Sequence, residues 1–256
     1  MKTALLLPVV AWGASLALAR PAPAQPAETP PVVGPDRPDA CNGIQVVPVG
    51  HVQVEGGVTL ARAAGSTDFD AGELMVRVPF SARVEARMQL FSFDWSRSRT
   101  STRGVVGPLV DLKWKIFDSE ATDFGVIVGT SLPVGSADYR SPHLHPYGVL
   151  SLDQTISGKA SVTVNAGVAG ASGSGATVGL VAGGVSVAFQ ASERAGLFLE
   201  GYGWNRTEPG GPGEQMIDSG LQYLLGNRVM VDARVGVTFG RESNGSFAGL
   251  GASFLF

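Results

Sequence analysis

The chain has 256 residues, of which 44% are hydrophobic and 16% are charged, and its formal net charge at pH 7 is −3. This balance provides no basic surface of the kind that a nucleic-acid-binding protein needs, so binding to nucleic acid is not expected. The single cysteine, Cys41, cannot form an internal disulfide and leaves the redox compartment undecided.

The N-terminal residues have the features of a secretory signal peptide. Lys2 supplies a positive charge, and an apolar stretch interrupted by Pro8 follows over residues 4–19. This stretch is shorter than the roughly 20 apolar residues of a membrane-spanning helix, so a transmembrane anchor is the less favoured alternative. Cleavage is expected before Gln25, which makes residues 1–24 the leader.

Residues 25–50 are rich in proline and are expected to form an extended, disordered periplasmic lead-in. Asp39 and Ala40 before Cys41 weakly resemble a lipid-attachment motif. They lie far from the apolar leader, with Asp where an aliphatic residue belongs, so no lipid attachment is expected. The sequence leaves open whether this lead-in plugs the domain that follows, and what Cys41 does.

Residues 51–256 consist of short segments in which polar and apolar side chains alternate, as in strands that separate two environments. Each segment is near the nine to eleven residues of a tilted, membrane-crossing strand. The pattern predicts an all-β fold, a transmembrane antiparallel up-and-down β-barrel of about 12 strands. The predicted strands cover residues 51–62, 72–80, 82–92, 104–117, 122–133, 145–156, 158–170, 176–189, 194–205, 214–225, 228–240 and 246–256.

The predicted connections alternate between short turns and longer loops, which is typical of outer-membrane barrels with both termini in the periplasm. A soluble antiparallel sheet with one wet face would show the same alternation of side chains, but it has no reason for this asymmetry. The long outer loops are expected at residues 63–71, 93–103, 134–144, 171–175, 206–213 and 241–245.

Charged residues within the predicted strands share one face. An Arg or Lys that faces lipid at the bilayer midplane costs roughly 2–4 kcal/mol, and a one-residue slip would expose every charge of a strand. The charged faces are therefore expected to line the lumen, where they either neutralise one another or form a selective constriction. The candidate lumen residues are Arg83, Glu85, Arg87, Asp111, Lys113, Lys115, Glu200, Asp218, Asp232 and Arg234.

Aromatic residues near the predicted strand ends are expected to form two girdles at the membrane interfaces. One strand fits badly, because Glu200 shares its face with Phe198, Tyr202 and Trp204. Either a bulge switches the faces or these aromatic side chains line the pore, and the second alternative is favoured. The expected girdle residues are Phe80, Phe117, Phe124, Phe189, Phe198, Tyr223, Phe254 and Phe256 at the periplasmic side, and Phe91, Phe93, Trp95, Tyr147, Trp204, Phe239 and Phe247 at the outer side.

The final strand ends on an aromatic residue. Ala248, Leu250, Ala252, Phe254 and Phe256 alternate with small or polar residues and project from one face of a strand. This ending resembles the C-terminal strand of bacterial outer-membrane barrels. The resemblance implies that Phe254 and Phe256 form an assembly signal, and that the partners are the barrel-assembly machinery and outer-membrane lipid.

Several phrases spread over the predicted barrel share one further resemblance. They are residues 112–115 (LKWK), 130–135 (TSLPVG), 199–203 (LEGYG), 218–225 (DSGLQYLL) and 231–236 (VDARVG), followed by the 249–251 (GLG) strand. Together they resemble the outer-membrane "putative MetA-pathway of phenol degradation" family, over residues 50–256. The resemblance implies an outer-membrane barrel proposed to admit small, often hydrophobic or aromatic molecules. It does not imply an enzyme of phenol breakdown.

The sequence provides little that points to catalysis. His143 and His145 could place two imidazoles on a metal, but without a nearby carboxylate cluster an exposed loop pair is favoured. The glycines at 173 and 175 indicate a turn rather than a phosphate-binding loop, since they join two strands instead of opening a helix. No serine carries a nucleophile-elbow pattern. We therefore assign no catalytic residue, no metal and no cofactor.

The leading hypothesis is a passive channel or transporter for small molecules in the bacterial outer membrane. Twelve strands lie between the filled eight-stranded barrels and the wide porins, so the strand number does not decide whether the lumen is open. The alternatives are an outer-membrane lipid-modifying enzyme and a non-conducting structural or adhesive barrel. Neither the permeant nor the oligomeric state follows from the sequence.

Overall fold

The computed structural model describes residues 32–37, 40–63, 65–98, 101–140, 143–173, 176–206, 211–240 and 244–256. The predicted signal peptide lies outside the described residues. None of the described residues forms a helix long and apolar enough to cross a bilayer.

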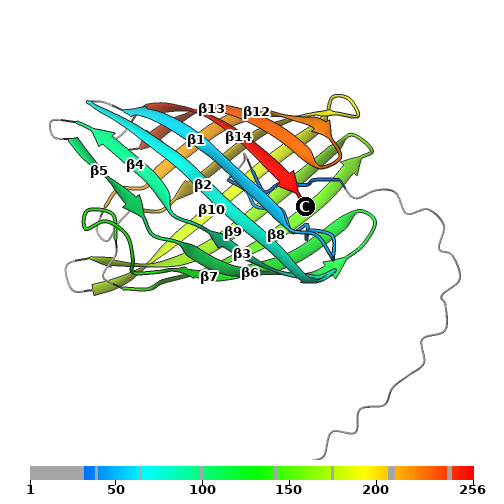
Figure 1. Ribbon diagram of the computed structural model, residues 1–256, viewed down its shortest axis with the longest axis horizontal. Helices are drawn as coiled ribbons and strands as arrows, with labels where there is room; N and C mark the ends of the chain where they lie inside the picture. Colours follow the sequence, from blue (N-terminus) through cyan, green and yellow to red (C-terminus); the bar gives the residue numbers. More distant parts are fainter. Residues whose placement is uncertain are drawn as a thin grey trace, which may run out of the picture. The chain divides into compact units, whose positions relative to one another are not determined.

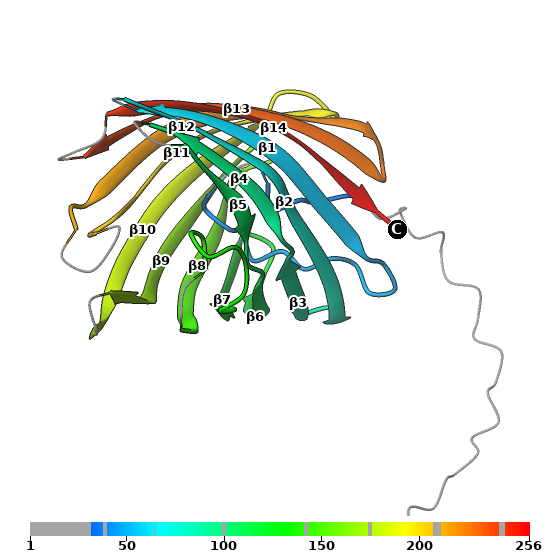
Figure 2. The same cartoon turned by 60° about the vertical axis from the view of Figure 1, so that its left-hand side comes forward.

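Fourteen antiparallel strands over the described residues form one sheet, which closes into a barrel because β1 pairs with both β14 and β2 (Figures 1 and 2). The strands are β1 (Gln53–Ala63), β2 (Ser66–Ser81), β3 (Val84–Gln89), β4 (Ser92–Arg97), β5 (Ser101–Val106), β6 (Leu109–Asp118), β7 (Thr122–Ser131), β8 (His145–Ser157), β9 (Ala160–Gly173), β10 (Ala176–Gln190), β11 (Ala195–Trp204), β12 (Glu214–Gly226), β13 (Val229–Gly240) and β14 (Gly245–Leu255).

The fourteen strands occupy twelve positions around the wall, because two positions are each filled by two short consecutive strands. β2 pairs with β3 through its C-terminal half and with β4 through its N-terminal half, so β3 and β4 follow one another along a single line of the wall. β5 and β6 pair with β4 and β3 in the same way. Pro108, which cannot donate to a ladder, lies in the break between β5 and β6. The predicted twelve-stranded barrel is confirmed.

Two of the predicted outer loops are instead strand. β1 and β2 are joined by a tight turn with Gly65 at a φ of 84°, and β2 begins at Ser66 within the predicted loop 63–71. Within the predicted loop 93–103, β4 and β5 pair as a hairpin. These outer strand ends are rich in Ser, Thr and Asp, which favour loops, although the alternation continues there: Asp68, Asp70 and Asp94 share one parity, and Phe69, Phe93 and Trp95 share the other.

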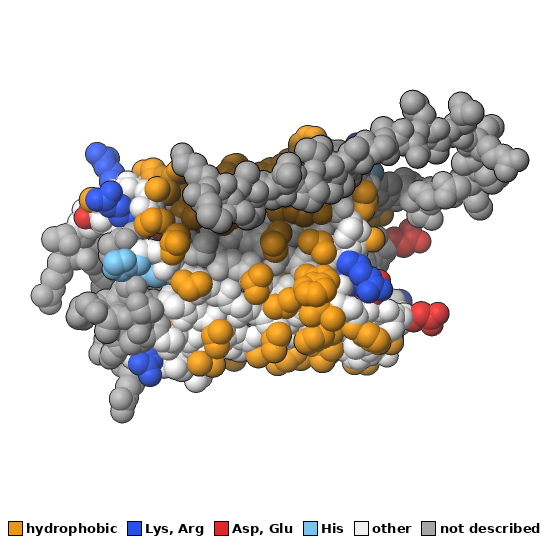
Figure 3. Space-filling model, turned by 90° about the horizontal axis from the view of Figure 1, so that it is seen from below, with side chains coloured by type: hydrophobic (Ala, Val, Ile, Leu, Met, Phe, Trp, Pro, Cys, Tyr) orange, Lys and Arg blue, Asp and Glu red, His pale blue; other side chains and the backbone are white. Residues whose placement is uncertain are grey.

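The two faces of the wall carry the predicted residue types. In β6, Lys113 is fully buried and faces the lumen, whereas its neighbours Leu112 and Trp114 are 46% and 52% exposed. Phe254 in β14 and Phe256 directly after it are 42% and 64% exposed and point outward, as the predicted parity requires. Hydrophobic side chains are spread over the outer face that Figure 3 shows. The register therefore keeps charge in the lumen and apolar surface toward lipid.

Several aromatic residues expected in the girdles lie inside the barrel instead. Phe198 and Phe247 are buried in the lumen, beside Gly220 and Gly236, which leave room for the rings. Tyr147 also points inward and donates a hydrogen bond to Asp111. The pairing of β11 with β10 and β12 contains no register shift, so the bulge alternative is wrong and the pore-lining alternative is confirmed for Phe198.

The outward position of Leu250, in the middle of β14, provides a test of the register. Leu250→Arg should destabilise the barrel in lipid vesicles by roughly 2–4 kcal/mol, because it places a charge on the lipid face. The measurement is the urea midpoint of unfolding from vesicles. Asn227→Arg, in the exposed turn between β12 and β13, is the matched control and should leave the midpoint unchanged. Equal midpoints for both variants would contradict the assigned lipid face.

Candidate functional site

Residues 32–37 and 40–50 pass through the interior of the barrel, with Val32 and residues 48–50 exposed at its ends, and we call them the plug segment (Figure 2). Val33, Cys41, Ile44 and Val47 in this segment are each at most 3% exposed. Disorder was expected over residues 25–50, and for the described part of that range the expectation is wrong. The segment has too few apolar residues to form a hydrophobic core of its own. Its apolar side chains are buried against residues of the barrel wall instead.

Both ends of the plug segment lie at the rim where β14 ends, the periplasmic rim in the predicted orientation. The Val33 amide donates to the Asn227 carbonyl, in the turn between β12 and β13, at 2.7 Å. Val33 and Val47 belong to one apolar cluster with Met230 and Leu255. The segment thus enters the lumen and returns to the same rim, where β1 begins.

Carboxylates of the wall accept hydrogen bonds from the backbone amides of the plug segment. An extended segment without a strand partner would otherwise bury unpaired N–H groups, and a charged acceptor gives stronger bonds than a neutral one. The acceptors come from four separate strands around the barrel. The bonds are Arg37 N to Glu55 at 3.1 Å, Ala40 N and Cys41 N to Glu200 at 2.5 and 2.9 Å, Ile44 N to Asp153 at 2.7 Å, and Val47 N to Glu85 at 2.8 Å.

Asp36 of the plug segment binds three cations of the wall. Its carboxylate lies 2.7 Å from Lys113 Nζ, 2.7 Å from an Arg87 nitrogen and 3.3 Å from an Arg77 nitrogen. Burial alone would raise the pKa of Asp36, but these three charges outweigh it and hold the pKa well below its ordinary value. The carboxylate therefore stays ionised, and removing it would leave buried positive charges without their partner.

The cations around Asp36 are also paired with wall carboxylates. Arg77 contacts Glu55 at 3.0 Å and Glu85 at 2.9 Å, and Arg87 contacts Asp111 at 2.7 Å. Together with Lys113, these residues form a buried network on β1, β2, β3 and β6, which we call the Asp36 network. Its charges are engaged with one another rather than facing an empty pore.

Arg37 of the plug segment makes further ionic contacts with β2 and β13, which β1 and β14 separate in the wall. It pairs with Glu73 and lies 3.8 Å from Asp232. Glu73 has a φ of 35°, uncommon for a residue other than glycine, and it follows Gly72 at 116°. The backbone of β2 is therefore kinked at Glu73, whose carboxylate pairs with Arg37 and accepts a hydrogen bond from the Thr59 hydroxyl.

Nine of the ten predicted lumen residues face the lumen, and Arg83 does not. Arg83 is exposed in the turn between β2 and β3, because β3 begins one residue later, at Val84. The structure brings Glu85, Arg87, Asp111 and Lys113 together around Asp36. The others are distributed along the lumen: Lys115 near Asp123, Glu200 directly opposite Asp218, Asp232 near Arg37, and Arg234 beside the Phe247 ring.

Sequence reasoning missed Asp36, Asp153 and the anchoring role of Glu55 and Arg77. The alternation does put Glu55 and Arg77 on the charged faces, so their strand parity could have added them to the candidates. Asp36 lies in a proline-rich segment without periodicity, and nothing local marks it as a buried residue.

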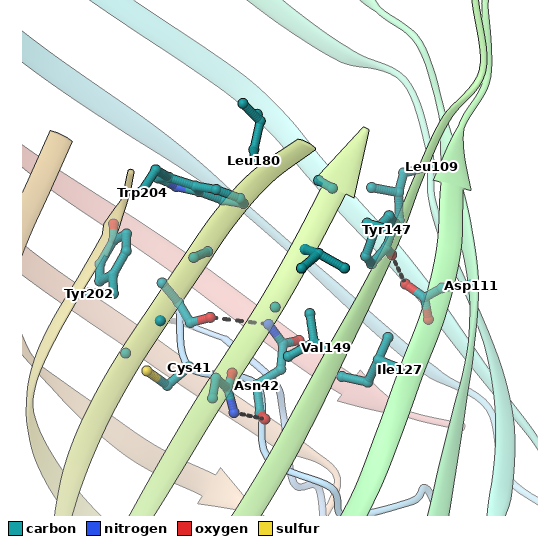
Figure 4. A pocket seen from close by; sticks show the side chains of 18 of the residues that line it. Cys41, Asn42, Leu109, Asp111, Ile127, Tyr147, Val149, Leu180, Tyr202 and Trp204 are labelled. Carbon is teal, nitrogen blue, oxygen red and sulfur yellow. Dashed lines mark hydrogen bonds between the residues drawn. The ribbon is translucent and has the colours of Figure 1, made fainter. Parts of the chain in front are cut away.

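The outer half of the lumen contains a cavity of about 720 Å³, which we call the outer cavity (Figure 4). Ala40, Cys41 and Asn42 of the plug segment lie at its base. The Asn42 carbonyl accepts a hydrogen bond from Asn165 Nδ2 at 3.1 Å, which ties that base to β9. The remaining lining comes mainly from the outer parts of β6 to β12, and Figure 4 shows Tyr202 and Trp204 on one side with Tyr147 on the other.

The Asp36 network predicts that plug docking depends on one side chain. Asp36→Asn should speed amide hydrogen exchange of the plug segment at least tenfold, because a neutral amide cannot balance three buried cations. Hydrogen exchange with mass spectrometry, on the barrel in detergent, measures this. Asp138→Asn, in an exposed loop, should change nothing. Unaltered plug exchange in Asp36→Asn would show that the wall carboxylates hold the segment without this network.

The sequence matches a known protein family over most of its length. Residues 35–256 match the family described as "Putative MetA-pathway of phenol degradation". No curated protein matches the chain.

Solved structures are similar at low sequence identity, which shows the barrel fold alone, and three of them serve as examples. An outer membrane channel from Pseudomonas putida F1 has a TM-score of 0.67 at 11% identity, covering 88% of this chain and 100% of that one. The NanC porin has a TM-score of 0.54 at 11% identity, covering 79% and 98%. The translocator domain of the autotransporter NalP from Neisseria meningitidis has a TM-score of 0.51 at 12% identity, covering 79% and 88%. Since the family match spans the whole barrel and most of the plug segment, the chain belongs to the family of the putative MetA-pathway of phenol degradation.

Proposed function

We propose that this protein is a passive channel for small molecules in the bacterial outer membrane. The observation that carries the proposal is the arrangement inside the barrel: an outer cavity of about 720 Å³ lies directly above a plug segment. Side-chain contacts, not strand pairing, hold that segment across the lumen. Such a segment can shift without breaking the ladder of the wall.

The contacts of the plug segment indicate how passage is controlled. Glu55, Glu85, Asp153 and Glu200 bind its backbone from four strands, and the Asp36 network binds its side chain. The segment, rather than a ring of free charges, is then the main restriction in the lumen. When it shifts, Arg77, Arg87 and Lys113 lose Asp36 and become available to permeating ions.

The neighbours of known structure agree with a non-enzymatic role, since they are named as a channel, a porin and a translocator domain. The lipid-modifying enzyme and the structural or adhesive barrel remain alternatives that no contact described above favours. Export by a cleaved signal peptide and recognition of Phe254 and Phe256 by the assembly machinery stay predictions.

A disulfide lock tests whether conduction needs movement of the plug segment. A Cβ at Gly184 would lie 2.6 Å from Cys41 Sγ, so Gly184→Cys places a second thiol within bonding reach of the only natural one. Single-channel currents in a planar bilayer should be small after oxidation and should increase on reduction. Gly184→Ser has a similar size, cannot form the bond, and should not respond to redox conditions.

Two outcomes of the lock experiment would count against the proposal. Equal currents in oxidised and reduced Gly184→Cys, with the disulfide verified by mass spectrometry, would mean that conduction bypasses the plug segment. Stable insertion without current, both in the reduced variant and in a chain lacking residues 25–46, would mean that the barrel is not a channel.

The different positions of Arg87 and Arg83 predict different effects on ion selectivity. Arg87→Gln removes a positive charge from the Asp36 network and should shift the reversal potential in a KCl gradient toward cation selectivity. Arg83→Gln, in the exposed turn of the same hairpin, is the matched control and should leave the reversal potential unchanged. An unchanged potential in Arg87→Gln would place the selective constriction elsewhere in the lumen.

A further inference from the structure

Three arginines face outward at the outer end of the barrel, and we call them the arginine patch: Arg62 on β1, Arg97 on β4 and Arg103 on β5. All three side chains are exposed. Arg62 has the strand parity of Leu60, which is 40% exposed, and Arg97 has that of Phe93, which is 44% exposed. The patch therefore lies on the same surface of the wall as the residues that face lipid.

The strand register brings the three arginines together, on strands that lie side by side in Figures 1 and 2. Arg62 and Arg97 pair with Thr67 of β2 from its two sides, so their Cα atoms are two strand spacings apart, about 10 Å. Arg103 pairs with Trp95, two residues from Arg97, which makes the two arginines diagonal neighbours about 7–8 Å apart. Because arginine has a long side chain, the three guanidinium groups can converge on one ligand.

Within the part of the chain that the structure describes, no carboxylate forms an ion pair with the arginine patch. Acidic residues are present on the same strands, but they have the opposite parity. Asp70 and Asp94 pair with each other and share the parity of Ser92, which is 4% exposed, so they face the lumen. Like charges on neighbouring strands repel one another, so the patch needs an anion from outside the chain.

The opposite rim of the barrel has a different character, because its exposed turns carry charges of both signs. Cations and carboxylates lie there in neighbouring turns, and the charges of that rim can balance one another. A cluster of one sign on an outward surface is therefore not a general property of the rims of this barrel. The exposed charged residues of these turns are Arg83, Asp118, Glu120, Lys159, Glu193, Arg194 and Arg228.

An apolar surface continues from the arginine patch toward the middle of the membrane. On β1, Leu60 and Val58 are the next outward residues after Arg62, and they are 40% and 38% exposed. On β4, Trp95 and Phe93 follow Arg97 on the same face. A ligand of the patch thus meets positive charge at one end and an apolar wall at the other. The molecule that fits both is a lipid with an anionic headgroup, the class that basic clusters at membrane surfaces recognise.

Charge balance indicates which headgroup fits the three arginines. Guanidinium groups bind phosphate oxygens in pairs, with a geometry that an ammonium group does not match. A phosphate monoester carries about −1.5 to −2 charges at pH 7, whereas the phosphodiester of an ordinary phospholipid carries a single negative charge. Two monoesters on one headgroup supply enough negative charge for the whole patch, and a single phosphodiester does not.

We propose that the arginine patch binds one phosphorylated glycolipid of the outer leaflet, with two phosphates on its sugar headgroup. The phosphates lie among Arg62, Arg97 and Arg103, and the acyl chains follow the apolar wall past Leu60 and Phe93. The site depends on the position of the barrel in the outer membrane and not on the conduction proposed above. From outside the wall, the lipid joins β1 to the β4–β5 hairpin across β2, and it therefore stabilises the outer ends of these strands.

Native mass spectrometry of the protein in detergent, titrated with lipid A, tests this site. Wild-type barrel should retain about one lipid A molecule. A triple variant with Arg62→Gln, Arg97→Gln and Arg103→Gln should bind it at least about tenfold more weakly, because it loses the charge-assisted hydrogen bonds to phosphate. Lipid A should also raise the temperature at which wild type unfolds, as followed by heat-dependent gel mobility, and should not raise that of the triple variant.

A second triple variant is the matched control. It removes the same number of positive charges from the opposite rim, where no lipid site is proposed, and should bind lipid A as wild type does. Heat-dependent gel mobility without lipid checks that both triple variants are folded. The control substitutions are Arg83→Gln, Arg194→Gln and Arg228→Gln.

Two further probes test the chemistry of the ligand. Phosphatidylglycerol, which has acyl chains and one phosphodiester, should bind wild type at least about tenfold more weakly than lipid A. Inorganic phosphate, which has no acyl chains, should not displace lipid A when added in roughly tenfold excess, because it gains nothing from the apolar wall.

Each result supports or overturns the site. Equal binding of lipid A by the two triple variants would mean general adsorption to the barrel and would overturn it. Equal affinities for phosphatidylglycerol and lipid A would overturn the headgroup with two phosphates, and displacement by inorganic phosphate would show a site for free anions rather than for a lipid. The same rise in unfolding temperature in wild type and the patch variant would overturn the stabilising role.

Discussion

The buried carboxylate of Asp36 is the contact on which the interior of this barrel depends. It joins a proline-rich segment that could not fold alone to three cations held by separate strands. Charges placed in a membrane barrel must point away from lipid, and once inside they need partners. The plug segment supplies one such partner, and the wall carboxylates in turn satisfy the segment's backbone amides. The plug segment therefore neutralises cations of the lumen, and the lumen carboxylates accept hydrogen bonds from the plug segment.

The wall could be predicted from the sequence because its determinants are local. Alternation with a period of two, together with the cost of charge in lipid, is enough to place Glu85 and Lys113 in the lumen and Leu250 outside. Two predictions failed for other reasons. The outer ends of β2 and β4 keep the alternation, but their Ser, Thr and Asp residues favour loops. Arg83 keeps the parity but lies beyond the strand end.

The interior could not be predicted in the same way, because its contacts join residues far apart in the chain. Asp36 and Lys113 are 77 positions apart, and Ala40 and Glu200 are 160 apart. No local pattern connects such pairs. Some signal was available for the aromatic residues: Tyr147 has the parity of Ser151 and Asp153, which marks it as inward-facing even though its place near a strand end suggested a girdle.

The course of the plug segment has a mechanical consequence. It enters and leaves at the same rim and continues directly into β1, so a displaced segment stays tethered. A pull on its N-terminal side would load the contacts one after another, beginning with Val33 and Asn227, and the segment would peel away at low force rather than shear as a block. Rebinding of the displaced segment would be intramolecular, at the high effective concentration that a short tether imposes. The rate of rebinding would therefore not depend on how many copies of the protein the membrane holds.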